Sequence, residues 1–275
     1  MKQYDLKDKK VLITGASSGI GKELSACFAG EGSELYLGCL PAEAAALDEW
    51  AGELKEKHGR HVHTYPVDLS GADGPGILYR EVVRDAGKID VLVNNAGIIA
   101  YGNFHELTLE RQEALVMVNL MAYMKLMRLF LPAMVAAREG RVFNVCSAAA
   151  FQPSVHHAVY GAAKAFVQSL SEAAHRELRD TGVRVFTLNP SYTDTPLLKG
   201  NGFPDRLWWY YFSGKSSPEK IARKGVRAFK KGKVVYIPGL RNWFVHAFLA
   251  RLLPRGLSGA ISDLALREKK TGGRA

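Results

Sequence analysis

Short apolar runs alternate with longer segments of helical periodicity along most of the chain. Strands that alternate with helices pair in parallel through right-handed crossovers, and the helices then cover both faces of the sheet. The pattern therefore predicts an α/β protein built on a doubly wound parallel sheet. The expected strands are residues 10–14, 35–37, 61–67, 89–93, 140–145 and 183–188, and the expected helices are 21–30, 42–58, 77–86, 109–137 and 158–179.

The pattern becomes less regular toward the C-terminus. Residues 199–217 contain six aromatic side chains, and residues 233–238 predict a further strand. Residues 242–253 predict an apolar helix accompanied by Arg241, Arg251 and Arg255. Because no repeat or linker divides the chain, we expect one domain over residues 1–240 and a C-terminal extension over residues 241–275.

The basic charge of the chain is concentrated at its C-terminal end. The formal net charge is +10, but residues 1–222 hold 24 Lys and Arg against 25 Asp and Glu. The last 53 residues hold 13 Lys and Arg against Asp263 and Glu268. An apolar and basic extension favours either packing on the body or a partner subunit, or contact with an anionic membrane surface. Nucleic acid is not expected as a partner, because no binding motif accompanies the charge.

Composition places the chain among ordinary globular proteins. Of its 275 residues, 47% are hydrophobic and 23% are charged, which suits a folded domain with a large core. Three cysteines, Cys27, Cys39 and Cys146, do not indicate a disulfide framework. The charged start lacks the apolar stretch of a secretory signal, and no run approaches about 18 apolar residues. We therefore expect a cytoplasmic protein, unless the extension holds it at a membrane.

The segment after the first predicted strand has the composition of a phosphate-binding loop. Its sequence from Thr14 is Thr-Gly-Ala-Ser-Ser-Gly-Ile-Gly, with glycines at 15, 19 and 21. Glycine allows a tight turn and lets the backbone approach a pyrophosphate, while the N-terminus of the following helix attracts the phosphates. Because the loop joins a predicted strand to a predicted helix, dinucleotide binding is favoured over an ordinary strand–helix turn.

Further motifs follow the glycine loop in a characteristic order. They are Asp68-Leu69, Asn94-Asn-Ala-Gly97, Asn119, Ser147 and Tyr160-Gly-Ala-Ala-Lys164. On these motifs and the loop, which together span roughly residues 8–198, the chain resembles the short-chain dehydrogenase/reductase family, classical type. The resemblance implies a Rossmann-type fold and an NAD(P)-dependent oxidoreductase that transfers a hydride between nicotinamide and an alcohol or carbonyl substrate.

The resemblance assigns catalysis to Asn119, Ser147, Tyr160 and Lys164. Tyr160 and Lys164 are four residues apart in a predicted helix, so they share one face. A neighbouring ammonium and an oxidised nicotinamide would lower the phenol pKa from about 10, so that Tyr160 could exchange a proton with the substrate. Ser147 would hydrogen-bond the substrate oxygen. In the family, the asparagine corresponding to Asn119 holds a water that connects the lysine to solvent.

The same resemblance implies which residues contact the cofactor. Asp68 and Leu69 correspond to an adenine-contacting pair, and Lys164 also corresponds to the residue that holds the nicotinamide ribose. In the family pattern Pro-Gly-x-x-x-Thr, Ser191 replaces the glycine, whereas Thr195 keeps the place of the threonine that bonds the carboxamide. The expected cofactor contacts are Gly15, Ser17, Ser18, Gly19, Ile20, Gly21, Asp68, Leu69, Asn95, Ala96, Gly97, Tyr160, Lys164, Pro190, Thr193 and Thr195.

The choice between the two nicotinamide cofactors depends on the end of the second strand. NAD-preferring members carry an acid there, which bonds the ribose 2′-hydroxyl, and NADP-preferring members often carry a basic residue there or in the glycine loop. This chain has Cys39-Leu-Pro41 at the strand end. Because no acid there would repel a 2′-phosphate, and because Ser17, Ser18 and Lys22 could assist, the sequence favours NADP over NAD.

The substrate is less closely defined by the sequence. Residues 191–217 correspond to the variable substrate loop of the family, and their aromatic side chains indicate a wide apolar pocket, with core or subunit packing as the alternative. His156 and His157 are candidates for the pocket lining. His61 and His63 lack a third ligand at suitable spacing, so no metal is expected.

The expected partners are a small-molecule alcohol or ketone and further copies of the chain. The resemblance implies a homodimer through the helices at 109–137 and 158–179, with a homotetramer as the larger alternative. Two functions without turnover remain open, a cofactor-binding redox sensor and a membrane-surface protein whose tail is the functional part. The intact set of Asn119, Ser147, Tyr160 and Lys164 argues against the sensor, because a non-catalytic protein would be free to lose one of them.

Overall fold

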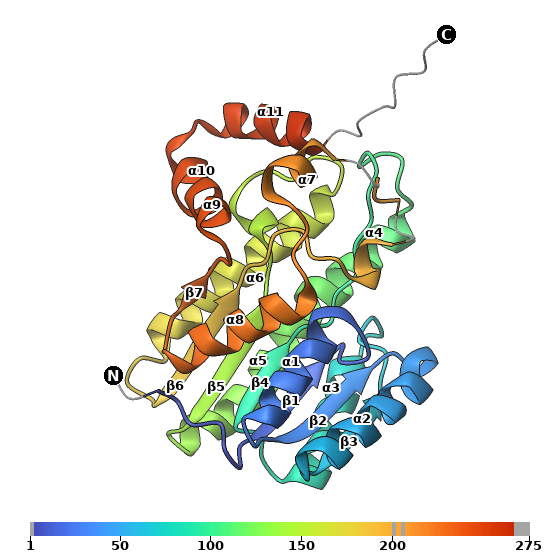
Figure 1. Ribbon diagram of the computed structural model, residues 1–275, viewed down its shortest axis with the longest axis vertical. Coiled ribbons are helices and arrows are strands. Elements are labelled where there is room, and N and C mark those ends of the chain that lie inside the picture. Colours follow the sequence, from blue (N-terminus) through green and yellow to red (C-terminus); the bar gives the residue numbers. More distant parts are fainter. Residues whose placement is uncertain (1–2, 200–201, 205–206, 267–275) are drawn as a thin grey trace.

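A parallel sheet with helices on both faces forms the core of the protein (Figure 1). The computed structural model describes residues 3–199, 202–204 and 207–266. Within these ranges, seven strands follow the order β3-β2-β1-β4-β5-β6-β7, which winds outward from β1 in both directions. The strands are β1 (Lys10–Thr14), β2 (Glu34–Cys39), β3 (Val62–Pro66), β4 (Val91–Asn94), β5 (Gly140–Val145), β6 (Val183–Leu188) and β7 (Val235–Tyr236).

Each central strand is apolar on both sides because helices cover both faces of the sheet. In β1, Val11 and Ile13 belong to the cluster on one face and Leu12 to the cluster on the other, and all three are fully buried. This explains the continuous apolar runs in the sequence. The first face is covered by α1 (Gly19–Gly30), α2 (Ala44–His58) and α8 (Pro218–Lys230), and the second by α3 (Gly74–Ala86), α5 (Ala122–Ala136) and α6 (Ala158–Glu177).

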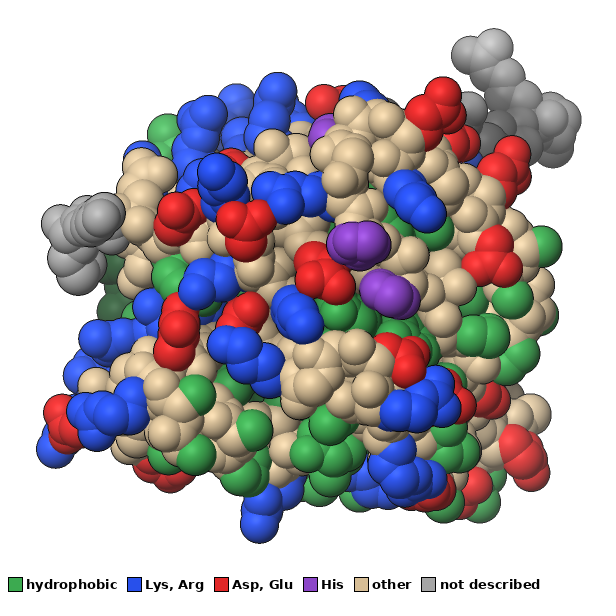
Figure 2. All heavy atoms as spheres, turned by 90° about the horizontal axis from the view of Figure 1, so that it is seen from below, with side chains coloured by type: hydrophobic (Ala, Val, Ile, Leu, Met, Phe, Trp, Pro, Cys, Tyr) green, Lys and Arg blue, Asp and Glu red, His purple; other side chains and the backbone are tan. Residues whose placement is uncertain are grey.

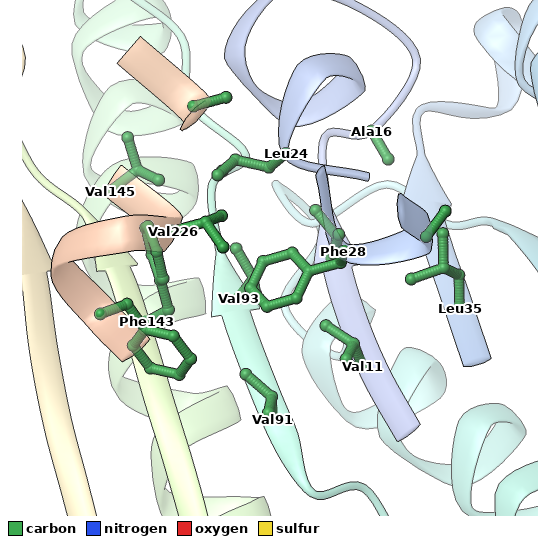
Figure 3. Packing of buried hydrophobic residues seen from close by; sticks show 14 of the residues in the cluster. Val11, Ala16, Leu24, Phe28, Leu35, Val91, Val93, Phe143, Val145 and Val226 are labelled. Carbon is green, nitrogen blue, oxygen red and sulfur yellow. The ribbon is translucent and has the colours of Figure 1, made fainter. Parts of the chain in front are cut away.

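Aromatic packing fixes α1 on the sheet (Figure 3). Phe28 of α1 lies edge-on to Phe143 of β5, with 6.3 Å between the ring centroids, and Val226 of α8 belongs to the same cluster. Full burial of such a side chain contributes roughly 1.5–3 kcal/mol. Because α1 begins in the glycine loop, this packing also holds the loop at the ends of the strands.

The long helix expected at residues 109–137 contains a π-helical segment. It consists of α4 (Leu109–Val116), the π segment Met117–Met121 and α5, and Pro132 lies inside α5 without ending it. By length and composition it is the one helix in the described chain that could cross a membrane. Leu126 and Phe130 are nevertheless buried in the second core cluster, as expected of a core helix.

The C-terminal part differs most from the sequence prediction. The strand predicted at 233–238 is reduced to the two residues of β7, which pairs with β6 alone. Helix α8 is absent from the predicted pattern, although Ser217 caps it and Pro218 begins it. The remaining helices lie together above the sheet in Figure 1. They are α7 (Trp208–Ser213), α9 (Leu240–Trp243), the π segment Phe244–Leu249, α10 (Ala250–Leu252) and α11 (Arg255–Leu266).

Candidate active site

One cavity of about 640 Å³ lies at the carboxyl ends of the central strands. The loops after β1, β4, β5 and β6 line it through Gly15, Asn95, Ser147 and Pro190. In a doubly wound sheet the loops separate where the winding direction reverses, which here is between β1 and β4. The topology therefore brings the predicted motifs, which are far apart in the sequence, to one cavity.

The glycine loop keeps its backbone close to the cavity. Gly15 and Gly19 have φ angles of +65° and +54°, in the left-handed region that favours glycine. A Cβ on Gly15 would lie 2.8 Å from the Cα of Ala96. Ser18, which precedes α1, makes no side-chain cap, and the first turn of the helix contains no acid. The positive end of α1 is therefore available to an anion beside the loop.

Gly21 is not among the residues that line the cavity, and its predicted contact with the cofactor stays a prediction. A Cβ on Gly21 would lie 2.0 Å from the backbone oxygen of Gly15 and 2.4 Å from Asn95 Nδ2. The missing side chain lets α1 begin directly against the loop. Gly21 thus serves the packing of helix on loop.

Asn95 holds the glycine loop in place. Its Nδ2 donates to the backbone oxygens of Thr14 and Gly15, both at 2.9 Å. In return, Thr14 Oγ1 accepts hydrogen bonds from the backbone N–H groups of Asn95 and Ala96, both at 3.0 Å. Asn95 and Ala96 line the cavity, but the amide of Asn95 is used within the protein.

The same cavity is lined by Tyr160, near the start of α6, and by Ser147, two residues after the end of β5. Burial raises the pKa of the Tyr160 phenol to about 12, and a hydrogen bond with Ser147 opposes this shift. The direction is opposite to the lowering expected from the sequence, because the loss of water around the phenolate outweighs its neighbours. The phenol is therefore protonated at neutral pH.

Lys164 is buried one helical turn after Tyr160. Its Nζ donates to Tyr123 Oη at 3.1 Å and to the backbone oxygen of Val145 at 3.0 Å, and it lies 5.9 Å from the ring centroid of Tyr160. Burial lowers the pKa of the ammonium to about 8. The charge of Lys164 is therefore sensitive to pH just above neutrality.

Asn119 lies in the π-helical segment and is fully buried. Its Oδ1 accepts from the backbone N–H of Ile98 at 3.2 Å, and its Nδ2 donates to the backbone oxygen of Ile98 at 2.7 Å. A Cβ on Gly97 would lie 2.8 Å from Asn119 Oδ1. Both ends of the amide therefore hold the loop after β4, and the π segment is of the kind often found at functional sites.

The other predicted cofactor contacts reach the cavity from several loops. Asp68 accepts from the backbone N–H and the hydroxyl of Ser70 at 2.8 and 2.7 Å. Ser191, where the family pattern has glycine, accepts from Trp209 Nε1 at 3.2 Å and so anchors the aromatic segment. The predicted contacts that line the cavity beside those already described are Ser17, Ser18, Gly19, Ile20, Asp68, Leu69, Gly97, Pro190, Thr193 and Thr195.

The helices from residue 240 to residue 266, called the roof here, form part of the cavity wall. His246 Nδ1 lies 2.9 Å from Gln152 Oε1, and Tyr101 Oη donates to the backbone oxygen of Leu266 at 2.6 Å. Of the alternatives for the extension, its described part therefore packs on the body. The roof residues in the wall are Val245, His246, Leu249, Ala250, Leu253, Ser258, Ile261, Ser262, Ala265 and Leu266.

Only some side chains of the aromatic segment at residues 199–217, and only one of His156 and His157, line the cavity in the described part of the chain. Among the described side chains of residues 199–217, Trp209 lines the cavity, Phe203 packs in a cluster with Tyr160, and Trp208 is half exposed. The side chains of residues 211–213 lie outside the described part. His157 lines the cavity, and burial lowers its pKa to about 4. His156 instead lies 3.6 Å from Asp263 of the roof.

Several residues that line the cavity were not indicated by the motifs. Glu43, in the 3₁₀ turn Pro41–Glu43, accepts a hydrogen bond from Ser17 Oγ at 2.6 Å. An acid shortly after the second strand was the available signal for it. No comparable signal pointed to Gln152 or to the roof. Among the described residues, no group of three His, Cys, Asp or Glu could hold a metal ion.

Comparison with known proteins agrees with this geometry. The model of the family described as short chain dehydrogenase matches residues 9–202. A short-chain dehydrogenase from Sphingobium yanoikuyae in complex with NADPH has a TM-score of 0.80 and 28% identity, over 97% of this chain and 100% of that one. An uncharacterized oxidoreductase of Staphylococcus saprophyticus is 32% identical over 227 residues, which is 82% of this chain and 93% of that protein.

A relative with a named activity shows the same relationship. The 3-oxoacyl-(acyl-carrier-protein) reductase of Thermotoga maritima is 32% identical over 192 residues, 70% of this chain and 77% of its own. The family match includes both the glycine loop and the segment of Tyr160 and Lys164 that the fold joins in one cavity. The chain therefore belongs to the short-chain dehydrogenase family of oxidoreductases.

Proposed function

We propose that this protein is an NAD(P)H-dependent reductase of uncharged, apolar ketones, which oxidises the matching alcohols in the reverse direction. The observation that carries the proposal is that Tyr160, Ser147 and Lys164 share one cavity with the glycine loop. A redox sensor without turnover would not need these three side chains beside its cofactor, so their presence in the cavity favours an enzyme.

The residues beside the glycine loop fit a nicotinamide dinucleotide. The uncapped start of α1 offers backbone N–H groups to a pyrophosphate. A Cβ on Gly19 would come within 3.1 Å of Thr195 Cγ2, so glycine keeps the loop from crowding Thr195. Asp68 and Leu69 would meet the adenine, and Thr195 the carboxamide. When bound, the cofactor supplies or accepts the hydride. The Sphingobium yanoikuyae relative, in complex with NADPH, supports this assignment.

Tyr160 donates the proton in the proposed reaction. Because its pKa is raised to about 12, the phenol holds its proton at neutral pH and can give it to a carbonyl oxygen that gains negative charge. The Ser147 hydroxyl donates a second hydrogen bond to that oxygen and stabilises the developing charge. A raised pKa favours reduction, because oxidation would require the Tyr160 phenolate as the base.

Lys164 supports Tyr160 electrostatically. Proton donation leaves a phenolate, and the Lys164 ammonium, with Nζ 5.9 Å from the ring centroid, lowers the free energy of that anion. Asn119 acts as a positioning residue, since its amide holds the backbone of Ile98 beside the same cavity. Loss of either side chain would slow the reaction without removing the proton donor.

The remaining wall of the cavity favours an uncharged apolar substrate. Lys164 is the one Lys or Arg among the described lining residues. Burial lowers the pKa of His157 and of His246 to about 4, so both are neutral at pH 7. A carboxylate or phosphate in this part of the cavity would find no partner of opposite charge, and its desolvation would oppose binding.

A panel of ketones tests the proposal. The protein is given NADH or NADPH with neutral apolar ketones, and with keto acids of matched size, and cofactor consumption is followed. We expect kcat/KM to be about 100-fold higher for the neutral member of each pair, because the carboxylate of the keto acid would lose its water in the cavity without gaining a partner. Preference for the keto acids would contradict the substrate class, and no consumption with any ketone would contradict the reductase.

The outward face of the roof favours a second property, peripheral contact with a membrane. Leu240, Leu252 and Leu264 are 88%, 65% and 64% exposed, and the neighbouring Arg241 is exposed as well. Exposed leucine and arginine side chains suit the interface of an anionic bilayer. We propose that this face rests on such a bilayer, from which an apolar substrate could enter.

Vesicle sedimentation tests the membrane contact. The protein is mixed with phosphatidylcholine vesicles with and without phosphatidylserine, and compared with the double variant L240S/L252S. Ile77→Ser on α3 serves as the control, because Ile77 is also exposed but lies outside the roof. Binding that needs phosphatidylserine and is lost only in the double variant supports the proposal. Equal sedimentation of all three proteins contradicts it.

Homo-oligomerisation through the two long helices is also proposed. Leu109 and Val116 of α4 and Phe166 of α6 are 67%, 36% and 39% exposed, which leaves apolar side chains available on both helices. Light scattering after size-exclusion chromatography would give the mass. A dimer or tetramer that becomes monomeric on Phe166→Glu is the expected result, and a monomeric wild type would contradict it.

A further inference from the structure

The turn after β2 brings an acid to the glycine loop. Pro41 begins the 3₁₀ turn and Glu43 ends it. Ser17 Oγ donates to Glu43 Oε2 at 2.6 Å, while Oε1 accepts no hydrogen bond from a described residue. Ser17 and Glu43 line the same cavity as Leu40 at the end of β2. A carboxylate with one uncommitted oxygen therefore lies in the turn just beyond the end of β2, although the strand end itself carries no acid.

The cation that the sequence offered at this place is engaged elsewhere. Lys22 Nζ lies 4.2 Å from the ring centroid of Trp50, and Lys22 is not among the lining residues. Ser17, a second candidate for a 2′-phosphate, already donates its hydroxyl proton to Glu43. Lys22 and Ser17 are thus committed within the protein, and Ser18, the third candidate, lines the cavity but carries no charge to balance a phosphate.

No other cation in the described lining lies near Glu43. Lys164 is the one Lys or Arg of the lining, and it contacts the end of β5. Strands β1 and β4 separate β5 from β2, which amounts to about 14 Å at roughly 4.8 Å per strand. A phosphate group near Glu43 and Asp68 would therefore meet two carboxylates and no balancing charge.

Building on the proposed function, we propose that Glu43 makes this enzyme select NAD(H) over NADP(H). Its Oε1 can accept a hydrogen bond from a hydroxyl of the adenosine ribose, whereas a 2′-phosphate in the same place would be repelled. Ser17 is a positioning residue, because its hydrogen bond to Oε2 fixes the carboxylate. The acid that the strand end lacks is thus supplied by the turn that Pro41 begins.

Binding measurements on three proteins test the inference. The wild type, Glu43→Gln and the control Glu49→Gln are titrated with NADH and with NADPH, and dissociation constants are taken from nicotinamide fluorescence. Glu49 suits the control because it is an exposed acid of α2 outside the cavity lining. We expect the wild type to bind NADH about 10- to 100-fold more tightly than NADPH. In Glu43→Gln the ratio of the NADPH to the NADH dissociation constant should fall to about three, mainly because NADPH binds more tightly. In Glu49→Gln this ratio should stay at the wild-type value.

Salt and a second variant separate charge from structure. Because like charges repel less at high ionic strength, added salt should narrow the ratio in the wild type and leave Glu43→Gln unchanged. Ser17→Ala should lose part of the discrimination, with an unchanged midpoint of thermal unfolding. Tighter binding of NADPH by the wild type, or an unchanged ratio in Glu43→Gln, would overturn the inference alone. Failure of both dinucleotides to bind any of the proteins would overturn the proposed function and the inference with it.

Discussion

The sheet and the roof bury their apolar side chains to very different extents. Val11 and Leu92 in the central strands are fully buried, whereas Leu240 and Leu252 of the roof are 88% and 65% exposed. Helices cover both faces of the sheet, so nearly every apolar side chain there has partners. The roof is a single layer with the cavity on one side, so its other side has no described layer to pack against.

This difference separates the two tasks of the site. The sheet places the glycine loop and Tyr160, the proposed proton donor, on elements held by the core. The roof supplies part of the cavity wall, which in the proposed function would meet the substrate. The face opposite the roof carries acidic and basic side chains together, in keeping with the balanced charge of residues 1–222 (Figure 2). The proposed catalytic residues thus lie in the closely packed region, and the proposed substrate wall lies in the region that is less buried.

Tyr160→Phe tests the sheet side of this comparison most severely. Without the hydroxyl no group donates the proton, so we expect kcat to fall by about 10³-fold. The dissociation constant of the dinucleotide should stay within about twofold, because the glycine loop is untouched. Steady-state kinetics and fluorescence titration measure the two quantities. Tyr79→Phe on α3 is the control, and turnover by Tyr160→Phe close to that of this control would contradict the assignment.

Two glycine substitutions compare the packing of the two regions directly. A Cβ on Gly21 would lie 2.0 Å from the Gly15 oxygen, whereas a Cβ on Gly256 in α11 would meet nothing within 4 Å. We expect Gly21→Ala to lower the free energy of unfolding by about 3 kcal/mol. Gly256→Ala should raise it by up to about 1 kcal/mol, because alanine favours the helix. Urea unfolding measures both free energies. Similar changes in the two variants would contradict the difference in packing between the glycine loop and the roof.

The pH dependence of reduction tests the charge of Lys164. Its pKa is lowered to about 8, so the ammonium is present at pH 7 and is lost as the pH rises through about 8. Tyr160, with a pKa raised to about 12, stays protonated over this range. We expect kcat/KM for reduction to fall above pH 8, by up to about tenfold per pH unit. In Lys164→Arg, which keeps its charge, kcat/KM should no longer fall above pH 8. If it still falls in this variant, the pH dependence comes from another group.

His246→Leu probes the roof with the smallest expected effect. The change removes the contact between His246 and Gln152 at 2.9 Å but keeps an apolar wall. We expect KM for an apolar ketone to rise about three- to tenfold, with kcat and dinucleotide affinity nearly unchanged. His105→Leu, at an exposed position, is the control. A fall in dinucleotide affinity would show that the roof also supports the cofactor side.

The features of the fold that can be predicted from the sequence lie mainly in the sheet and not in the roof. Strands β5 and β6 have the predicted bounds, and every predicted cofactor contact except Gly21 lines the cavity. These features depend on short-range properties, such as apolar runs, glycine conformation and a four-residue spacing on one helix. Helices α8 and α11 were not foreseen, and the strand predicted at 233–238 is reduced to the two residues of β7, because contacts with distant residues decide these elements.

By itself, the sequence determined the doubly wound sheet, the glycine loop and the proximity of Tyr160 and Lys164. Only the tertiary structure decided that Ser17 meets Glu43, 26 residues away, and that Gln152 meets His246, 94 residues away. It also decided that the pKa of Tyr160 is raised by burial, where the sequence predicted that neighbouring positive charges would lower it. Local conformation is encoded within a few residues, whereas burial and side-chain contacts across the cavity depend on the whole chain being folded.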